Sequence, residues 1–185
     1  MKEIHCDREF KPLMDPVKDM MGVEMHYPPA GDHVPQAERL NRVIGERVRA
    51  IYHDLPYKNL PKIMWKYLAM VAIDSLNWFP ARGGVSKYYS PHTLLRQRQL
   101  DFNTNFVAPF GSFVQAYEEW NPKNNNTPRT IDAIYLRPTA DRQRGHEVIN
   151  LMTGQVVVRP RVTKIPITDW VIKTCLLYTS DAADE

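Results

Sequence analysis

The chain has 185 residues, 43% of them hydrophobic and 24% charged, which is the composition of a soluble globular protein with one core or a core plus a small appendage. No run approaches the roughly 18 apolar residues of a membrane span, and the first residues are too polar for a signal peptide, so we expect no membrane partner. Two cysteines, Cys6 and Cys175, exclude a disulfide framework and a cysteine-based metal cluster and fit a reducing compartment.

The first third of the chain predicts a strand, a helix, a second strand, a loop and a long helix. The first three elements are expected over residues 2–6, 9–21 and 23–27. Asp7 would lie at the carboxyl end of the first strand. Pro12 and Pro16 would interrupt or offset the helix, and Gly22 would terminate it. Residues 28–32, rich in proline and glycine, predict a loop before the long helix.

Residues 37–52 predict an amphipathic helix. One apolar stripe contains Leu40, Val43, Ile44, Val48 and Ile51. The opposite face carries Glu38, followed by Arg42 and Arg49. One carboxylate at the head of a helix, with arginines further along, suits a surface that binds metal and phosphate. The alternative is a solvated face with a Glu–Arg pair four residues apart, which stabilises a helix by roughly 0.2–0.5 kcal/mol.

A second long helix is predicted from Pro61 to about Trp78, with apolar residues on more than one face and therefore well buried. Residues 75–100 contain no acidic residue. They contain four cations, with Tyr88 and Tyr89 between them: Arg82, Lys87, Arg96 and Arg98. This composition fits a phosphate-facing patch, and it fits a solvated linker equally well.

The pattern changes to short β-branched strands after residue 108. Four strands are expected, over residues 112–117, 130–136, 147–151 and 155–165, and together they suggest a small antiparallel barrel. Arg159 and Arg161 lie two positions apart on the last strand, so they would share one face. That face would be either a second, smaller basic patch or simply a solvated outer face.

Residues 175–185 read CLLYTSDAADE, which looks like an in-frame translation of the mosaic end and adapter used in transposase-based sequencing libraries. We therefore expect these residues to be translated adapter and leave them out of the fold; a natural acidic tail is the alternative. The segment contains three acids and no base, so the remaining chain has 24 basic and 18 acidic residues. The formal charge rises from +3 to +6, which favours an anionic partner.

Residues 33–56 (HVPQAERLNRVIGERVRAIYHDLP) resemble the final catalytic helix of copia-type retrotransposon integrases. The similarity extends over about residues 5–173. It includes Met64-Trp65, the YSPHTLL turn at 89–95, PFGSFV at 109–114, IDAIYLRP at 131–138, GHEV at 145–148, Thr153-Gly154 and VVVR at 156–159. The order and spacing of these motifs carry the resemblance.

The resemblance implies an α/β fold whose parts follow one another along the chain. A partial RNase H-like integrase core would occupy residues 1–80 and a basic linker with a short helix residues 81–107. A small SH3-like β-barrel would occupy residues 108–174, followed by the adapter translation at 175–185. The middle acid departs from the usual family motif, because Asp7-Arg-Glu-Phe10 lacks its glycine and lies 31 positions before Glu38, closer than is usual.

By the same resemblance, the function is DNA integration by metal-dependent polynucleotidyl transfer. Asp7 and Glu38 would be the catalytic acids and ligands of Mg²⁺ or Mn²⁺, with Glu9 as the fallback for Asp7. The first acid of the triad would lie upstream, so the chain alone is expected to be inactive. The partner would be DNA, contacted by Arg42, Arg49, Arg82, Lys87, Arg96, Arg98, Arg159 and Arg161.

The family further implies a homo-oligomer in the complete integrase, located in cytoplasmic virus-like particles and in the nucleus. Two other function classes stay open at this point. One is a non-catalytic nucleic-acid-binding remnant of a retroelement, in which Glu38 has no role. The other is a structural or interaction domain with no nucleic-acid partner.

Overall fold

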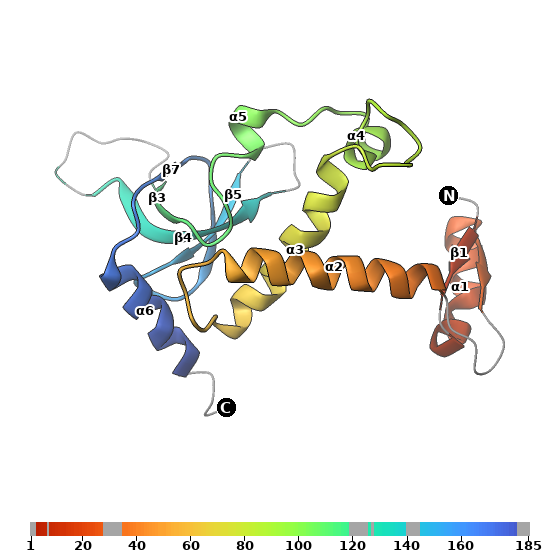
Figure 1. The fold of residues 1–185 in the computed structure, drawn as a ribbon, viewed down its shortest axis with the longest axis horizontal. Helices are drawn as coiled ribbons and strands as arrows, with labels where there is room; N and C mark the ends of the chain where they lie inside the picture. Colours follow the sequence, from red (N-terminus) through yellow and green to blue (C-terminus); the bar gives the residue numbers. More distant parts are fainter. Residues whose placement is uncertain are drawn as a thin grey trace. The chain divides into compact units, whose positions relative to one another are not determined.

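The structure is a computed structural model of the chain, and it describes residues 3–6, 8–27, 35–118, 126, 128–139 and 145–180. The chain forms two compact units, residues 1–46 and residues 47–185. Helix α2 (Pro35–His53) begins in the first unit and ends in the second (Figure 1). No helix among the described residues is long and apolar enough to cross a membrane.

The first unit confirms the predicted order of strand, helix, strand and long helix. Its elements before α2 are β1 (Glu3–His5), the 3₁₀ helix η1 (Arg8–Leu13), α1 (Met14–Met21) and β2 (Glu24–His26). Pro12 lies inside η1, which explains why the predicted single helix is divided. Gly22 ends α1 in the left-handed conformation, with φ of 61°, and its N–H donates to the carbonyl of Lys18.

Strands β1 and β2 pair in parallel, with Ile4 opposite Met25. A parallel pair joined through a helix is a βαβ unit, but this one has little core, because Val23 is the buried residue among those described in the unit. Large apolar side chains of this unit are exposed, among them Phe10, Leu13, Met20, Met21 and Leu40. A two-stranded sheet of this kind does not establish the predicted RNase H-like core.

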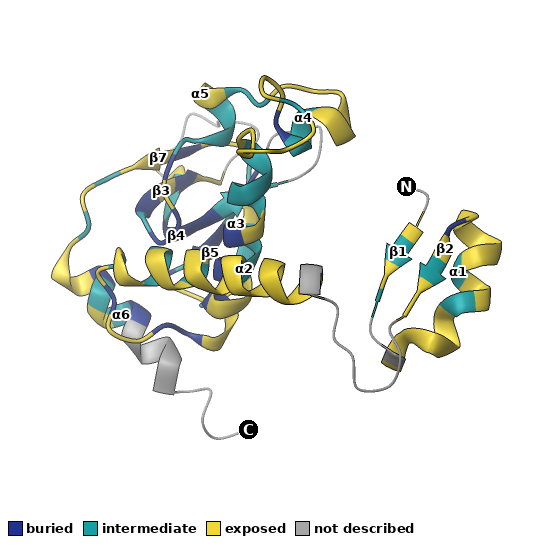
Figure 2. Ribbon diagram, turned by 45° about the vertical axis from the view of Figure 1, so that its right-hand side comes forward, coloured by how far each residue is buried: buried dark blue, intermediate teal, exposed yellow. Residues whose placement is uncertain are grey.

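In the second unit, helix α3 (Lys62–Trp78) lies against the sheet and supplies the centre of the core (Figure 2). Its buried side chains, Met64, Leu68 and Ala72, recur every four residues and so form one stripe. The predicted helix is confirmed, with Pro61 at its N-cap, but the prediction of burial on more than one face is wrong. Ile63 and Ile73 are about two-fifths exposed, because the sheet covers one side of the helix.

The end of α2 and the last helix, α6 (Asp169–Ser180), complete this core. Val48 and Ile51, the second half of the predicted apolar stripe on α2, pack against it. Cys175 is buried in α6, with its Sγ atom 3.9 Å from Met64 Sδ, so this first residue of the expected adapter translation belongs to the core. The origin of residues 175–185 stays a prediction, and residues 181–185 lie outside the described part.

The sheet of the second unit is antiparallel, with the order β6-β5-β4-β3-β7. Its strands are β3 (Phe113–Tyr117), β4 (Thr130–Pro138), β5 (His146–Asn150), β6 (Val156–Arg159) and β7 (Val162–Lys164). Two short helices, α4 (Pro91–Arg96) and α5 (Phe102–Asn105), connect α3 to β3. The antiparallel strands are confirmed, but the predicted closed, SH3-like barrel is wrong, because β6 and β7 are the two edges of an open sheet.

Pro160 explains why five strands form instead of four. It has no N–H to donate and divides the predicted strand 155–165 into β6 and β7. The three steps from Arg159 to Val162 span at most about 11 Å. Four strand spacings across a flat sheet would be about 19 Å, so the sheet must curve for the chain to pass from one edge to the other.

Gly111 in the turn before β3 offers a test of how tightly the second unit is packed. Its φ is 77°, and a Cβ atom there would lie 2.5 Å from Leu55 Cδ2. We expect Gly111→Ala to lower the free energy of unfolding by about 1–3 kcal/mol through backbone strain and overpacking. Gly45→Ala is the matched control in α2, where the space is open, and should raise it by roughly 0.5–1 kcal/mol.

Urea unfolding followed by circular dichroism measures both variants. Equal stabilities of Gly111→Ala and the parent chain would contradict the packing of the 106–112 segment against the end of α2.

Candidate functional site

Glu38 lies in the first turn of helix α2, and its side chain is exposed. An acid at this position is stabilised by the positive end of the helix dipole. The other predicted catalytic acid, Asp7, lies outside the described residues, as does the predicted loop 28–32. Glu9, its fallback, is exposed in η1. The part of the chain that the structure describes holds no group of three His, Cys, Asp or Glu side chains placed to bind a metal.

The two predicted phosphate-binding arginines of α2 are both exposed. Arg42 Nε donates a hydrogen bond to Glu46 Oε1 at 3.1 Å, and four-fifths of the Arg42 side chain is accessible. A pair this exposed contributes little to stability and leaves the guanidinium open to solvent. Arg49 lies two turns after Arg42 on the same helix.

Four predicted cations, placed between α3 and α4, at the end of α4 and just after it, are also exposed: Arg82, Lys87, Arg96 and Arg98. Ser90 caps α4, because its Oγ accepts from the Thr93 N–H at 3.2 Å. Burial raises the pKa of Asp74, and Arg96 is among the cations that oppose this rise, so the charge of Arg96 is partly compensated. Of the four, Arg82, Lys87 and Arg98 are therefore the less compensated cations.

Arg159 and Arg161 do not share a strand face, so that prediction is wrong. Arg159 ends β6 at one edge of the sheet, and Arg161 precedes β7 at the other, because Pro160 divides the strand. Both side chains still turn toward the end of β3. Arg159 contacts Glu118 Oε1 at 3.3 Å, and the Arg161 guanidinium lies 5.5 Å from the Tyr117 ring centre. Glu118 therefore neutralises part of the positive charge of this second basic patch.

A largely buried ion-pair cluster was not predicted from the sequence. Arg137 on β4 is 13% exposed and contacts Asp74 on α3 at 2.9 Å and Glu147 on β5 at 2.6 Å. Burial raises the pKa of Asp74, and Arg137 opposes this rise. A shift of register between Tyr135 and Arg137 marks a bulge in β4 at this point. Only the folded sheet brings these charges together, so local sequence patterns carry no signal for them.

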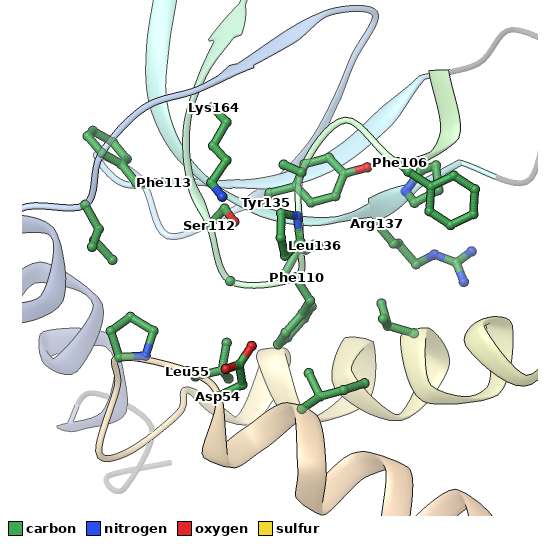
Figure 3. A pocket seen from close by; sticks show the side chains of 18 of the residues that line it. Asp54, Leu55, Phe106, Phe110, Ser112, Phe113, Tyr135, Leu136, Arg137 and Lys164 are labelled. Atoms are coloured by element: carbon green, nitrogen blue, oxygen red, sulfur yellow. The ribbon is translucent and has the colours of Figure 1, made fainter. Parts of the chain in front are cut away.

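A pocket of about 1030 Å³ lies between the end of α2, the segment 105–113 and the sheet (Figure 3). Its lining is mainly apolar and includes Ile51, Leu55, Trp78, Phe106, Phe110, Phe113 and Leu136. The labelled charged groups Asp54 and Lys164 come from opposite walls, and the Arg137 guanidinium turns toward α3 (Figure 3). Such a lining offers binding rather than acid–base chemistry.

No protein-family model and no curated protein matches this chain. The resemblance to copia-type integrases therefore rests on the order and spacing of its own motifs.

Removing the cation of the buried cluster tests its contribution to stability. We expect Arg137→Ala to lower the free energy of unfolding by roughly 1–3 kcal/mol, because Asp74 and Glu147 would be left as partly buried, unpaired carboxylates. Arg42→Ala, which breaks the exposed pair with Glu46, should cost less than about 0.5 kcal/mol. Chemical denaturation of both variants at one salt concentration measures the difference; equal losses would argue against a buried cluster.

His146 predicts a loss of stability in acid. Its ring is buried, Nδ1 lies 3.2 Å from the Tyr135 hydroxyl, and burial lowers its pKa from the ordinary 6.5. The unfolded chain therefore takes up this proton first. The stability that the neutral ring contributes is complete above about pH 6.5 and is lost as the pH falls below it.

The free energy of unfolding should rise with pH through this window, and His146→Gln should make the dependence shallower. Tyr135→Phe keeps the buried ring and should keep the dependence while lowering overall stability. An unchanged pH profile in His146→Gln would refute the assignment.

Proposed function

We propose that this chain is a fragment of a copia-type retrotransposon integrase, which in its complete form joins DNA ends by metal-dependent polynucleotidyl transfer. The observation that carries the proposal is the placement of Glu38. It is an exposed carboxylate in the first turn of a long helix that directly follows a parallel strand–helix–strand unit. This is the local order in which the resemblance requires the last acid of the triad.

The chemistry explains why carboxylates are needed. A pair of divalent ions activates the attacking hydroxyl and stabilises the leaving oxygen in polynucleotidyl transfer, and Mg²⁺ or Mn²⁺ prefers oxygen ligands. Glu38 would supply one ligand and Asp7, or Glu9 in its place, a second. The first acid would come from a strand upstream. Without it, the ions would be held weakly and the fragment would be inactive.

DNA is the partner that the exposed cations favour. Arg42 and Arg49 follow Glu38 along α2, where they would neutralise phosphates beside the reacting end. Arg82, Lys87 and Arg98 offer a second contact region, while Arg159 is partly neutralised by Glu118. The complete integrase would act as a homo-oligomer, in cytoplasmic virus-like particles and in the nucleus.

The second candidate function is a non-catalytic nucleic-acid-binding remnant of such an element. One observation favours it: the described residues expose cations in both units. In this case Glu38 would be an ordinary acid of the helix amino terminus and the phosphate contacts alone would matter.

The reading frame upstream of Met1 distinguishes the two candidates. An in-frame strand ending in Asp, preceded by a His/Cys zinc pattern, would support the integrase; a stop codon or unrelated sequence would leave only the remnant.

The 185-residue chain alone is expected to show no strand transfer. The frame-extended protein should join 3′-hydroxyl DNA ends in the presence of Mg²⁺ or Mn²⁺. Glu38→Gln should abolish the reaction, since it removes a metal ligand. Asp169→Asn, a neutral replacement of another exposed acid in the first turn of a helix, should leave joining nearly unchanged. Equal activity of the two variants would exclude Glu38 as a catalytic acid.

A further inference from the structure

The loop of residues 81–90 lies between α3 and α4 and is named the tyrosine loop. It holds two of the most exposed large side chains in the described structure. Tyr88 is 88% exposed and Val85 98%, and the loop is largely coloured as exposed in Figure 2. An aromatic ring kept in water offers a face on which a ligand can stack.

The tyrosine loop is held in shape by its own hydrogen bonds. Ser86 Oγ accepts from the backbone N–H groups of Tyr88 and Tyr89, at 3.1 and 3.0 Å. The Gly84 N–H donates to the Ala81 carbonyl at 3.0 Å, and Ser90, which caps α4, is buried. Because the turn is already formed, presenting Tyr88 to a ligand costs little additional ordering.

Cations lie near this ring in the sequence. Lys87 precedes Tyr88 directly, Arg82 and Arg98 flank the segment, and all three are exposed. None of these three has an acidic partner within salt-bridge distance in the part of the chain that the structure describes, and residues 75–100 contain no acid. Cations without partners beside an exposed aromatic ring are the combination by which proteins hold a sugar–phosphate strand and its bases together.

We propose that the tyrosine loop binds unpaired, single-stranded nucleic acid, with Tyr88 stacking on a base and Lys87, Arg82 and Arg98 contacting phosphates. In a duplex the base faces are stacked on one another and are closed to a side chain, whereas an unpaired base exposes its face. This inference rests on the proposed function, because it specifies which form of nucleic acid the chain contacts at this surface.

The test compares a labelled oligothymidylate with a duplex of equal length, by fluorescence anisotropy on the full chain. Tyr88→Ala should weaken single-strand binding about 5- to 100-fold, the range expected for loss of one stacked base, and leave duplex binding within about twofold. Tyr88→Phe keeps the ring and should restore single-strand affinity to within about twofold of the parent chain. Lys87→Ala should weaken binding of both ligands and reduce the salt dependence.

The outcomes separate this inference from the proposed function. Salt-dependent duplex binding together with single-strand binding that is unchanged in Tyr88→Ala would overturn the stacking role and leave the proposed function standing. Binding of neither ligand would overturn both. Binding to anionic phospholipid vesicles in place of oligothymidylate would show that the exposed ring serves a membrane surface. The replaced side chains are exposed and carry no core contact, so each variant is expected to fold. Circular dichroism of each variant checks this.

Discussion

The packing of one face of α3 against the curved sheet holds the larger unit together. Met64 and Leu68 are completely buried and meet Ile134 and Leu136 of β4 in the same core. The other parts of the unit attach to this layer. Cys175 of α6 lies against Met64, and the end of α2 packs beside it. Burial of several large apolar side chains, each favourable by roughly 1.5–3 kcal/mol, gives this unit a core of its own.

Among its described residues the first unit has no comparable core, and this bears directly on its chemistry. Glu38 lies in the first turn of a helix, its side chain is exposed, and Val23 is the buried residue among those described in the unit. Metal-dependent catalysis needs ligands held within about half an ångström of their working positions. An exposed acid in a unit with so little core among its described residues is poorly suited to that task by itself. The proposal of an integrase that works only in its complete form agrees with this.

Local patterns predicted the elements well, and long-range pairing is where they failed. The 3.6-residue period of α2 and the terminator Gly22 depend on neighbours in the sequence, so they could be read directly. Closure of the sheet could not be predicted in this way, because it depends on whether β6 and β7 pair with each other, and in the fold they lie at opposite edges of the sheet. The Arg137 cluster was not predicted from the sequence for the same reason, since the partners of Arg137 lie on α3 and β5.

The fold also decides which cations remain for a phosphate, and net charge alone does not. Arg137 is taken up by two acids, Arg159 by Glu118 and, in part, Arg42 by Glu46. An Arg already paired with a carboxylate must give up that contact before it can bind a phosphate, which cancels much of the gain. Arg82, Lys87 and Arg98 have no such partner among the described residues, and they flank an exposed ring in the sequence. If the chain binds nucleic acid as proposed, affinity in the larger unit should therefore concentrate at this loop, although basic residues are spread along the whole sequence.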